Sequence, residues 1–352
     1  MIVAGTLGAW AVLVALFVPA ALSGRHFAER SPRLGIFAWQ AASVSVLVAL
    51  VLAGVALAAP ASPFSTNLAV ILSACLMALE RGYATPGGTG VALAGVVLSV
   101  AVASRSLGCL AIGLARSARE RARHAEVLGL VARASEHRGA VVLDHETPAA
   151  YCLAGRHRRV VVTSGALVAL DEAQLDAVLA HERAHLAGRH HLVVGAATAL
   201  RRAFPRVPLF AQAETEVARL VELAADDAAA ARHGRLAVAS AMVTVASGDA
   251  PSMAMAAGGG AALERVHRLL GPARPLGLGT LLAGLAACGA LVVLPALAAA
   301  SPVLAAGRMA PCPMAATAPT VAMGPNCNAQ RPSAPIPPRT VGLQAEPSYY
   351  HV

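Results

Sequence analysis

Residues 181–185 read His-Glu-Arg-Ala-His, and this run decides how the rest of the chain is interpreted. On an α-helix, residues four apart lie on one face, so His181 and His185 can direct ring nitrogens at a single metal ion. Glu182 flanks that face, where a carboxylate can take a proton from water at an open coordination position. The run therefore predicts a catalytic zinc site in which Glu182 is the general base and acid.

The residues before this run predict the helix that such a site needs. Asp171 is a candidate N-cap and, with Gln174 three residues later, approximates a capping box. Leu175, Val178 and Leu179 follow at helical spacing. The metal-binding run is therefore expected about two to three turns into a helix.

A third ligand is expected from residues 222–226, which read Glu-Leu-Ala-Ala-Asp and lie in a segment, 214–231, without Gly or Pro. Gly234 is the expected end of this second helix. Glu222 and Asp226 share a face, so Glu222 can bind the metal while Asp226 holds a ligand histidine through its other ring nitrogen. Two His and one Glu leave the fourth zinc position open, as catalysis requires.

Long apolar segments predict that the chain is anchored in a membrane. The 352 residues are 57% hydrophobic and only 13% charged. The segments long enough to cross about 30 Å of hydrocarbon as helices are 2–22, 34–59, 90–114 and 276–299. Residues 67–79 are apolar but short, so a re-entrant or interfacial piece is expected there, with a full crossing as the alternative.

Basic residues set the expected orientation. The turn after the first apolar segment carries Arg25, Arg30 and Arg33, and four Arg residues open the segment after the third, so both are expected in the cytoplasm. The N-terminus and the C-terminal tail are then outside, and residues 115–275 are cytosolic. A cleaved signal peptide is the alternative for residues 2–22, although no basic region precedes them.

The formal net charge of +9 raises the question of nucleic-acid binding. Between residues 115 and 274 the chain has 20 Arg against 16 Asp and Glu, without aromatic stacking residues among the charges. Much of the excess lies in turns beside apolar segments, where anionic headgroups account for it. We therefore expect no direct nucleic-acid binding. Arg105, inside the third apolar segment, is expected to snorkel to the cytoplasmic surface, with a functional intramembrane charge as the alternative.

The cytosolic segment predicts one α+β domain. An exposed edge strand beside the metal cleft would let an extended peptide bind by backbone hydrogen bonds. The expected elements are a helix at 117–136, strands at 140–143, 150–155 and 159–163, the helix with His181, the helix with Glu222, and a helix at 261–270.

These motifs resemble the membrane gluzincin peptidases, which include the BlaR/MecR-type antirepressors and the HtpX and CAAX-prenyl-protease types. The pattern of that group, His-Glu-x-x-His followed by Glu-x-x-Ala-Asp, is matched by His181, Glu182, His185, Glu222 and Asp226.

Two further features extend the resemblance. Residues 159–167, Arg-Val-Val-Val-Thr-Ser-Gly-Ala-Leu, are similar to the strand and turn before the metal helix in that group. Three apolar segments before residues 115–275 and one after them are similar to the BlaR branch.

The resemblance implies a zinc metalloendopeptidase that binds one Zn²⁺ per subunit and acts on protein substrates. A BlaI-type transcriptional repressor is the leading partner, and HtpX-like quality control of membrane proteins is the alternative within enzymes. A non-catalytic membrane receptor that retains the fold is the alternative outside enzymes, and the intact Glu182 argues against it.

The chain also departs from its relatives. Arg265 is the candidate for an active-site arginine of the HtpX type, but Gly259 stands six residues earlier, where that type carries a His-Pro-Pro element. The BlaR branch senses β-lactams through a Ser-x-x-Lys serine, whereas this chain contains no Lys. Sensing of β-lactams by that chemistry is therefore excluded.

Several His and Cys residues lie outside these motifs. His190 and His191 would lie away from the ligand face of a continuous helix, so a solvated or cytoplasmic-edge position is expected for both, with further metal ligands as the alternative. Cys152 is expected near the substrate edge without a nucleophilic role. The Pro-rich tail holds Cys312 and Cys327, which could form a disulfide or remain free thiols.

The sequence thus predicts an α-helical multi-pass membrane protein with an inserted α+β zincin-like (gluzincin) cytosolic protease domain. Its expected parts are a membrane domain at 1–114, the metallopeptidase domain at 115–275, a fourth transmembrane helix at 276–299 and a disordered extracytoplasmic tail at 300–352.

Overall fold

The computed structural model describes residues 1–23, 25–58, 88–131, 136–155, 158–247, 252–272 and 275–308. Residues 1–308 form one compact unit. The expectations for residues 67–79 and for Cys312 and Cys327 lie outside the described residues.

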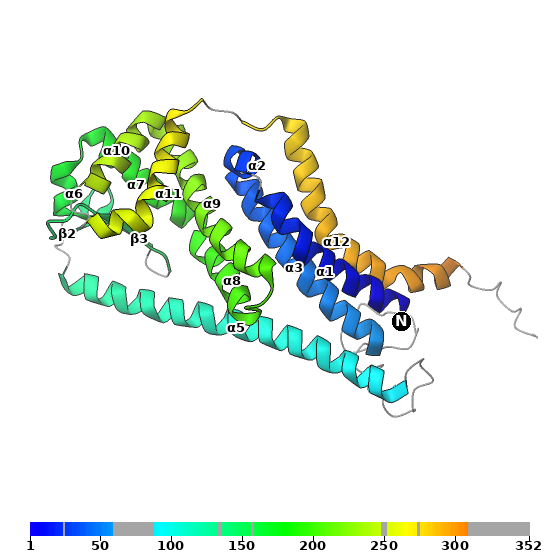
Figure 1. The fold of residues 1–352 in the computed structure, drawn as a ribbon. Helices are drawn as coiled ribbons and strands as arrows, with labels where there is room; N and C mark the ends of the chain where they lie inside the picture. Colours follow the sequence, from blue (N-terminus) through cyan, green and yellow to red (C-terminus); the bar gives the residue numbers. More distant parts are fainter. Residues whose placement is uncertain are drawn as a thin grey trace, which may run out of the picture. The chain divides into compact units, whose positions relative to one another are not determined.

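Three long apolar helices pack side by side (Figure 1): α1 (Ile2–Leu22), α3 (Pro32–Ala58) and α12 (Leu278–Arg308), with the short α2 (Arg25–Arg30) between the first two. A fourth helix, α5 (Gly88–Val131), packs closely against α3 at Gly54 and Gly95. The absence of side chains at these two glycines permits the approach, since a Cβ on either one would collide with the carbonyl oxygen of the other glycine. Among the described residues, these four helices are long and apolar enough to cross a membrane. This arrangement is compatible with a membrane protein.

Several of the predicted helix boundaries are wrong. The segments expected as separate helices at 90–114 and 117–136 form the single helix α5, since residues 114–128 contain neither Gly nor Pro to end it. Glu136 already belongs to a strand. Helix α12 also continues to Arg308, so residues 300–308 are helical rather than part of a disordered tail.

A four-stranded sheet follows α5, in the order β1-β2-β4-β3. Strands β2 (Ala140–Leu143) and β4 (Arg159–Thr163) stand where β-branched residues predicted them. Strand β3 (Ala150–Leu153) lies within the segment expected at 150–155, and β1 (Glu136–His137) was not predicted. β2 and β4 are parallel, whereas β3 is antiparallel to β4 and forms one edge of the sheet.

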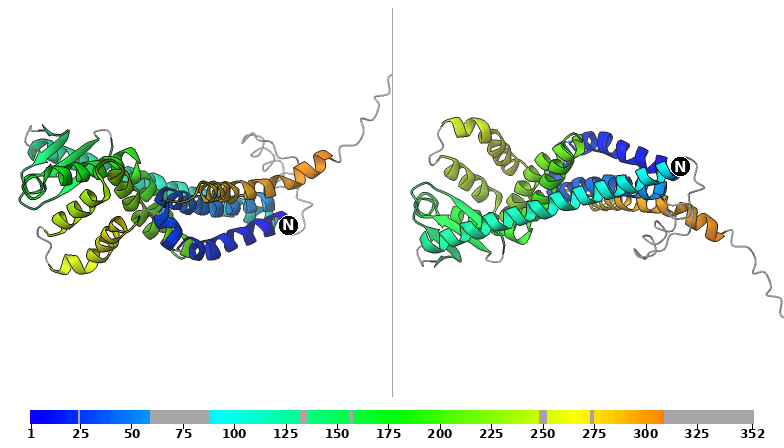
Figure 2. Two further views of the ribbon diagram at one scale, coloured as in Figure 1. Left: turned by 90° about the horizontal axis from the view of Figure 1, so that it is seen from above. Right: turned by 90° about the horizontal axis from the view of Figure 1, so that it is seen from below.

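Six helices complete this region, and Figure 2 shows α9 running from it toward α1 and α3. The helix expected at 214–231 begins earlier, at Pro208, the helix expected at 261–270 begins at Ser252, and α10 was not predicted. The helices are α6 (Ser164–Ala169), α7 (Glu172–Ala187), α8 (His190–Ala203), α9 (Pro208–His233), α10 (Arg235–Ser247) and α11 (Ser252–Leu270).

Arg105 connects the long apolar helix α5 to helix α8. Its Nε donates a hydrogen bond to the carbonyl oxygen of Ala203, the last residue of α8. The bond forms because the end of α8 lies within reach and leaves a carbonyl without a helical partner. Snorkelling of the exposed Arg105 side chain to the cytoplasmic surface stays a prediction. Gln40 of α3 likewise donates to the carbonyl oxygen of Val193 (3.0 Å) in α8.

Candidate active site

A capping box starts the helix that carries the first two candidate ligands. The Asp171 carboxylate accepts from the backbone N–H of Gln174 (2.8 Å), and the Gln174 side chain accepts from the backbone N–H of Asp171 (3.1 Å). Ala177 and Ala180 of α7 are buried against Ala229 of α9. Their small side chains let α7 and α9 approach closely enough for both helices to contribute ligands to one point.

The three candidate metal ligands meet as the sequence predicted. Nε2 of His181 and Nε2 of His185 are 3.1 Å apart, and each lies 3.5 Å from a carboxylate oxygen of Glu222. Ligands at about 2.0–2.1 Å from a tetrahedral zinc stand roughly 3.4 Å from one another, so these separations fit one zinc ion. The donor set, two imidazoles and one carboxylate, is also the set of catalytic zinc sites.

Asp226 and Arg265 contact the candidate ligands and orient them. An Asp226 oxygen lies 3.0 Å from Nδ1 of His181, which leaves Nε2 of that ring directed at the metal position. Arg265 of α11 donates two hydrogen bonds to Asp226 (2.8 and 2.7 Å), and its Nη1 lies 3.1 Å from Glu222. The guanidinium expected to act in catalysis is therefore engaged with the two carboxylates.

The electrostatics of this cluster favour a cation between the ligands. Burial lowers the pKa of His181, but hydrogen bonds to Asp226 and Glu222 outweigh it and raise that pKa to about 9. Burial raises the pKa of Asp226, yet hydrogen bonds from Arg265 and His181 bring it down to about 2. Asp226 is therefore an anion at neutral pH, and the field that holds a proton on His181 would also attract a metal ion.

Glu182 projects from α7 toward strand β3. Its side chain makes a hydrogen bond with the Cys152 thiol, and burial raises the pKa of the Glu182 carboxyl. Burial and the nearby Glu182 carboxylate also raise the pKa of Cys152 to about 12, so this thiol is neutral and is no nucleophile at physiological pH. Among the described strands β3 pairs only with β4, so its outer edge is available beside Glu182.

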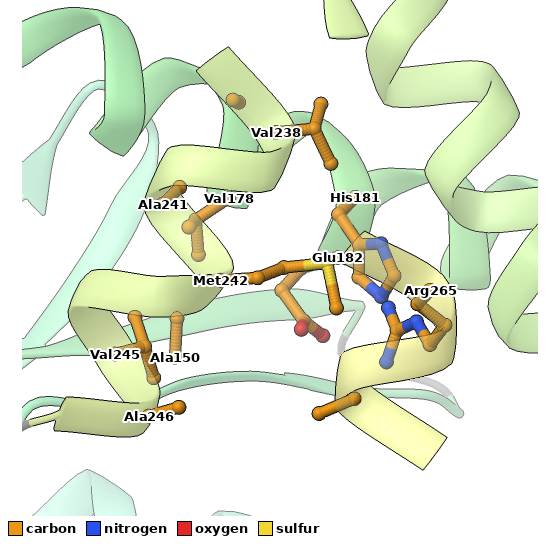
Figure 3. A pocket seen from close by; sticks show the side chains of 12 residues that line it. Ala150, Val178, His181, Glu182, Val238, Ala241, Met242, Val245, Ala246 and Arg265 are labelled. Atoms are coloured by element: carbon orange, nitrogen blue, oxygen red, sulfur yellow. The ribbon is translucent and has the colours of Figure 1, made fainter. Parts of the chain in front are cut away.

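A pocket of about 250 Å³ opens beside Glu182. Figure 3 shows His181, Glu182 and Arg265 on one side of it, with Met242 reaching toward them from α10. The other lining residues are apolar, namely Ala150, Ala177, Val178, Val238, Ala241, Val245, Ala246 and Ala262.

His190 has a role that the sequence interpretation missed. The expected solvated position is wrong, because α7 ends at Ala187 with Gly188 as its C-cap and Arg189 takes a left-handed conformation (φ 49°), so α8 turns His190 back toward the site. Nδ1 of His190 lies 2.9 Å from Nδ1 of His185. Burial and the neighbouring His185 lower the pKa of His190 to about 4, so its ring is neutral and its Nδ1 can accept a hydrogen bond from the Nδ1–H of His185. Gly188 was the one available signal of the break.

The match to known families falls on this site. Residues 117–205 match the model of Peptidase family M48. The matched segment contains His181, Glu182 and His185 and ends before Glu222, Asp226 and Arg265. Neither the curated proteins nor the solved structures that were searched match the chain. The M48 match, together with the four apolar helices, supports a membrane metallopeptidase.

Proposed function

We propose that the chain is a zinc-dependent endopeptidase anchored in the cell membrane, with its active site in the cytoplasm. The observation that carries this proposal is the meeting of His181, His185 and Glu222 at zinc-ligand separations, with the Glu182 carboxylate on the adjoining side. The M48 match over residues 117–205 supports the same chemistry.

The residues present fit a zinc ion held by Nε2 of His181, Nε2 of His185 and the Glu222 carboxylate. When bound, zinc would polarise the scissile carbonyl and acidify an attacking water. Glu182 takes the proton from that water and later delivers it to the leaving amine. Its raised pKa suits both tasks, since a base of higher pKa holds the proton long enough to return it.

The substrate is an extended segment of protein. Its backbone would pair with the free edge of β3, as an added strand. One of its side chains would enter the apolar pocket beside Glu182, and the predominance of Ala, Val and Met in the lining favours an apolar side chain next to the scissile bond.

The leading physiological substrate is a cytosolic transcriptional repressor of the BlaI type. Three apolar segments before the site and one after it are the basis for this choice. Cleavage of several membrane proteins, in the HtpX manner, is the second candidate. The position of α9 against α1 and α3 favours it, because this places the site close to the apolar helices.

A comparison of whole-cell protein termini tests the proposal. Strains would carry wild type or Glu182→Gln at equal levels, with zinc content measured in both proteins. New termini that require Glu182 are expected, and one DNA-binding substrate would favour the repressor, whereas several membrane substrates would favour quality control. If both proteins bind zinc and no terminus depends on Glu182 under any condition tried, the peptidase proposal fails and a receptor role gains support.

A further inference from the structure

A second cavity, of about 570 Å³, lies on the other side of the metal-binding helix α7. Small residues of α7 and α9, all Ala or Gly, make the space. Every ionisable residue in its lining is basic, and no Asp or Glu of the described residues lines it. The basic residues are Arg33, Arg183, His190, Arg232 and His233.

The three arginines of this basic cavity differ from the other arginines near the site. Arg219, Arg265 and Arg268 each pair with carboxylates. In the described part of the chain, Arg33, Arg183 and Arg232 make no ion pair. Arg183 donates to the carbonyl oxygen of Arg138, and Arg232 to that of Ala228 (3.5 Å). Several positive charges around one space without a carboxylate favour an anionic occupant.

The position of Arg33 indicates where that anion comes from. Arg33 is the second residue of α3, whose 27 residues give a helix about 40 Å long. The hydrocarbon of a bilayer is only about 30 Å thick, so the first turn of α3 would stand among the lipid headgroups. Arg33 is also exposed, so its side chain is free to reach a ligand in the cavity.

We propose that this basic cavity binds the phosphate of an anionic phospholipid headgroup. Guanidinium groups from α3, α7 and α9 can donate paired hydrogen bonds to phosphate oxygens, and the alanine floor leaves room for the glycerol part of the headgroup. His190 lines the cavity and also contacts His185, so a bound headgroup would touch the residue that supports a metal ligand. This inference rests on the proposed membrane anchoring and not on peptidase activity.

A binding measurement tests the proposal. The full chain would be purified in neutral detergent and titrated with short-chain phosphatidylglycerol, short-chain phosphatidylcholine and inorganic phosphate. The double variant Arg33→Gln/Arg232→Gln is expected to bind phosphatidylglycerol about tenfold more weakly or worse, a loss of about 1.4 kcal/mol. The matched control, Arg202→Gln/Arg206→Gln, removes two exposed charges, one in the last turn of α8 and one in the turn after it, and is expected to bind like wild type.

The outcomes of this titration distinguish a lipid site from a soluble-phosphate site and from no site. Zinc content and the melting temperature of each variant show whether it is folded, independently of activity. The proposal is supported if wild type binds phosphatidylglycerol in preference to phosphatidylcholine and if Arg33→Gln/Arg232→Gln loses this binding while the control variant keeps it. Equal binding of both lipids, or equal losses in the two double variants, overturns it. If inorganic phosphate binds with the same dependence on Arg33 and Arg232 while the lipid does not bind, the ligand is a soluble phosphate and the lipid assignment is wrong.

Discussion

Asp226 joins the candidate metal ligands to Arg265. Only 1% of its side chain is exposed, and it accepts hydrogen bonds from both His181 and Arg265. Arg265 also contacts Glu222. Its guanidinium therefore contacts both the candidate ligand Glu222 and Asp226, the residue that orients the candidate ligand His181. Removal of the Asp226 charge would leave Arg265 partly unpaired in a half-buried position, which is costlier than the loss of a surface ion pair.

The variant Asp226→Asn is expected to bind zinc about 10–100-fold more weakly than wild type, because His181 loses the anion at its Nδ1. Competition with a fluorescent chelator measures this affinity. The control is Asp227→Asn, whose carboxylate is 41% exposed and pairs with Arg268 (2.8 Å) away from the ligands. Equal zinc affinity in the two variants would show that Asp226 does not support His181.

The same carboxylate predicts a pH dependence of stability. Its pKa is about 2 in the folded protein, below the ordinary value of 3.8. Because the folded value is the lower one, Asp226 stabilises the fold above about pH 4, and this contribution is lost as the pH falls toward 2. The difference in melting temperature between wild type and Asp226→Asn should stay constant from about pH 7 to 5 and shrink below about pH 4. A difference that grows on acidification would contradict this assignment.

At the scale of elements, the parts of the site that depend on local sequence were predictable. The capping box at Asp171, the four-residue spacing of His181 and His185, and that of Glu222 and Asp226 act within single helices, so residue order alone predicts them. The β-branched runs likewise predicted β2 and β4.

Other parts depend on contacts between elements or on a local break, and the sequence pattern did not predict them. The family resemblance pointed to Arg265, but its contact with Asp226 arises because α11 returns beside α9, a tertiary contact without a periodic signature. His190 lies near His185 because Arg189, a residue without special preference for positive φ, adopts the left-handed conformation after Gly188. Helix α10 supplies much of the pocket and was missed altogether.

Helix α10 gives a prediction about specificity. Met242→Trp would fill much of the apolar pocket, so cleavage of peptides with a large apolar side chain next to the scissile bond should fall about tenfold or more relative to peptides with Ala there. Values of kcat/KM for such peptide pairs measure the change. Val243→Trp is the control, since Val243 follows on α10, is 51% exposed and does not line the pocket. An unchanged preference in Met242→Trp would mean that substrates do not use this pocket.

At the scale of the whole molecule, the metal-ligand helix α9 shares its core with the apolar helices. Leu209, Phe210 and Leu220 of α9 are buried in the same cluster as Leu7 of α1 and Trp39 of α3. Helix α5 likewise extends from α3 to the sheet, where Leu128 packs against Leu153 and Val161. The helices expected to cross the membrane thus complete the core that positions Glu222.

The chain cut to residues 115–275 should therefore not fold alone, although the sequence marks this segment as a domain. The cut removes α1 and α3 and exposes the buried face of α9, and each large apolar side chain left exposed forfeits about 1.5–3 kcal/mol. Size-exclusion chromatography and zinc content of 115–275 are the measurements, and aggregation with zinc bound weakly or not at all is expected. A chain of residues 1–308, the compact unit, is the control and should remain monodisperse in detergent with one zinc per chain. A monodisperse 115–275 that binds zinc as tightly as residues 1–308 would show that the apolar helices anchor the site without supporting its structure.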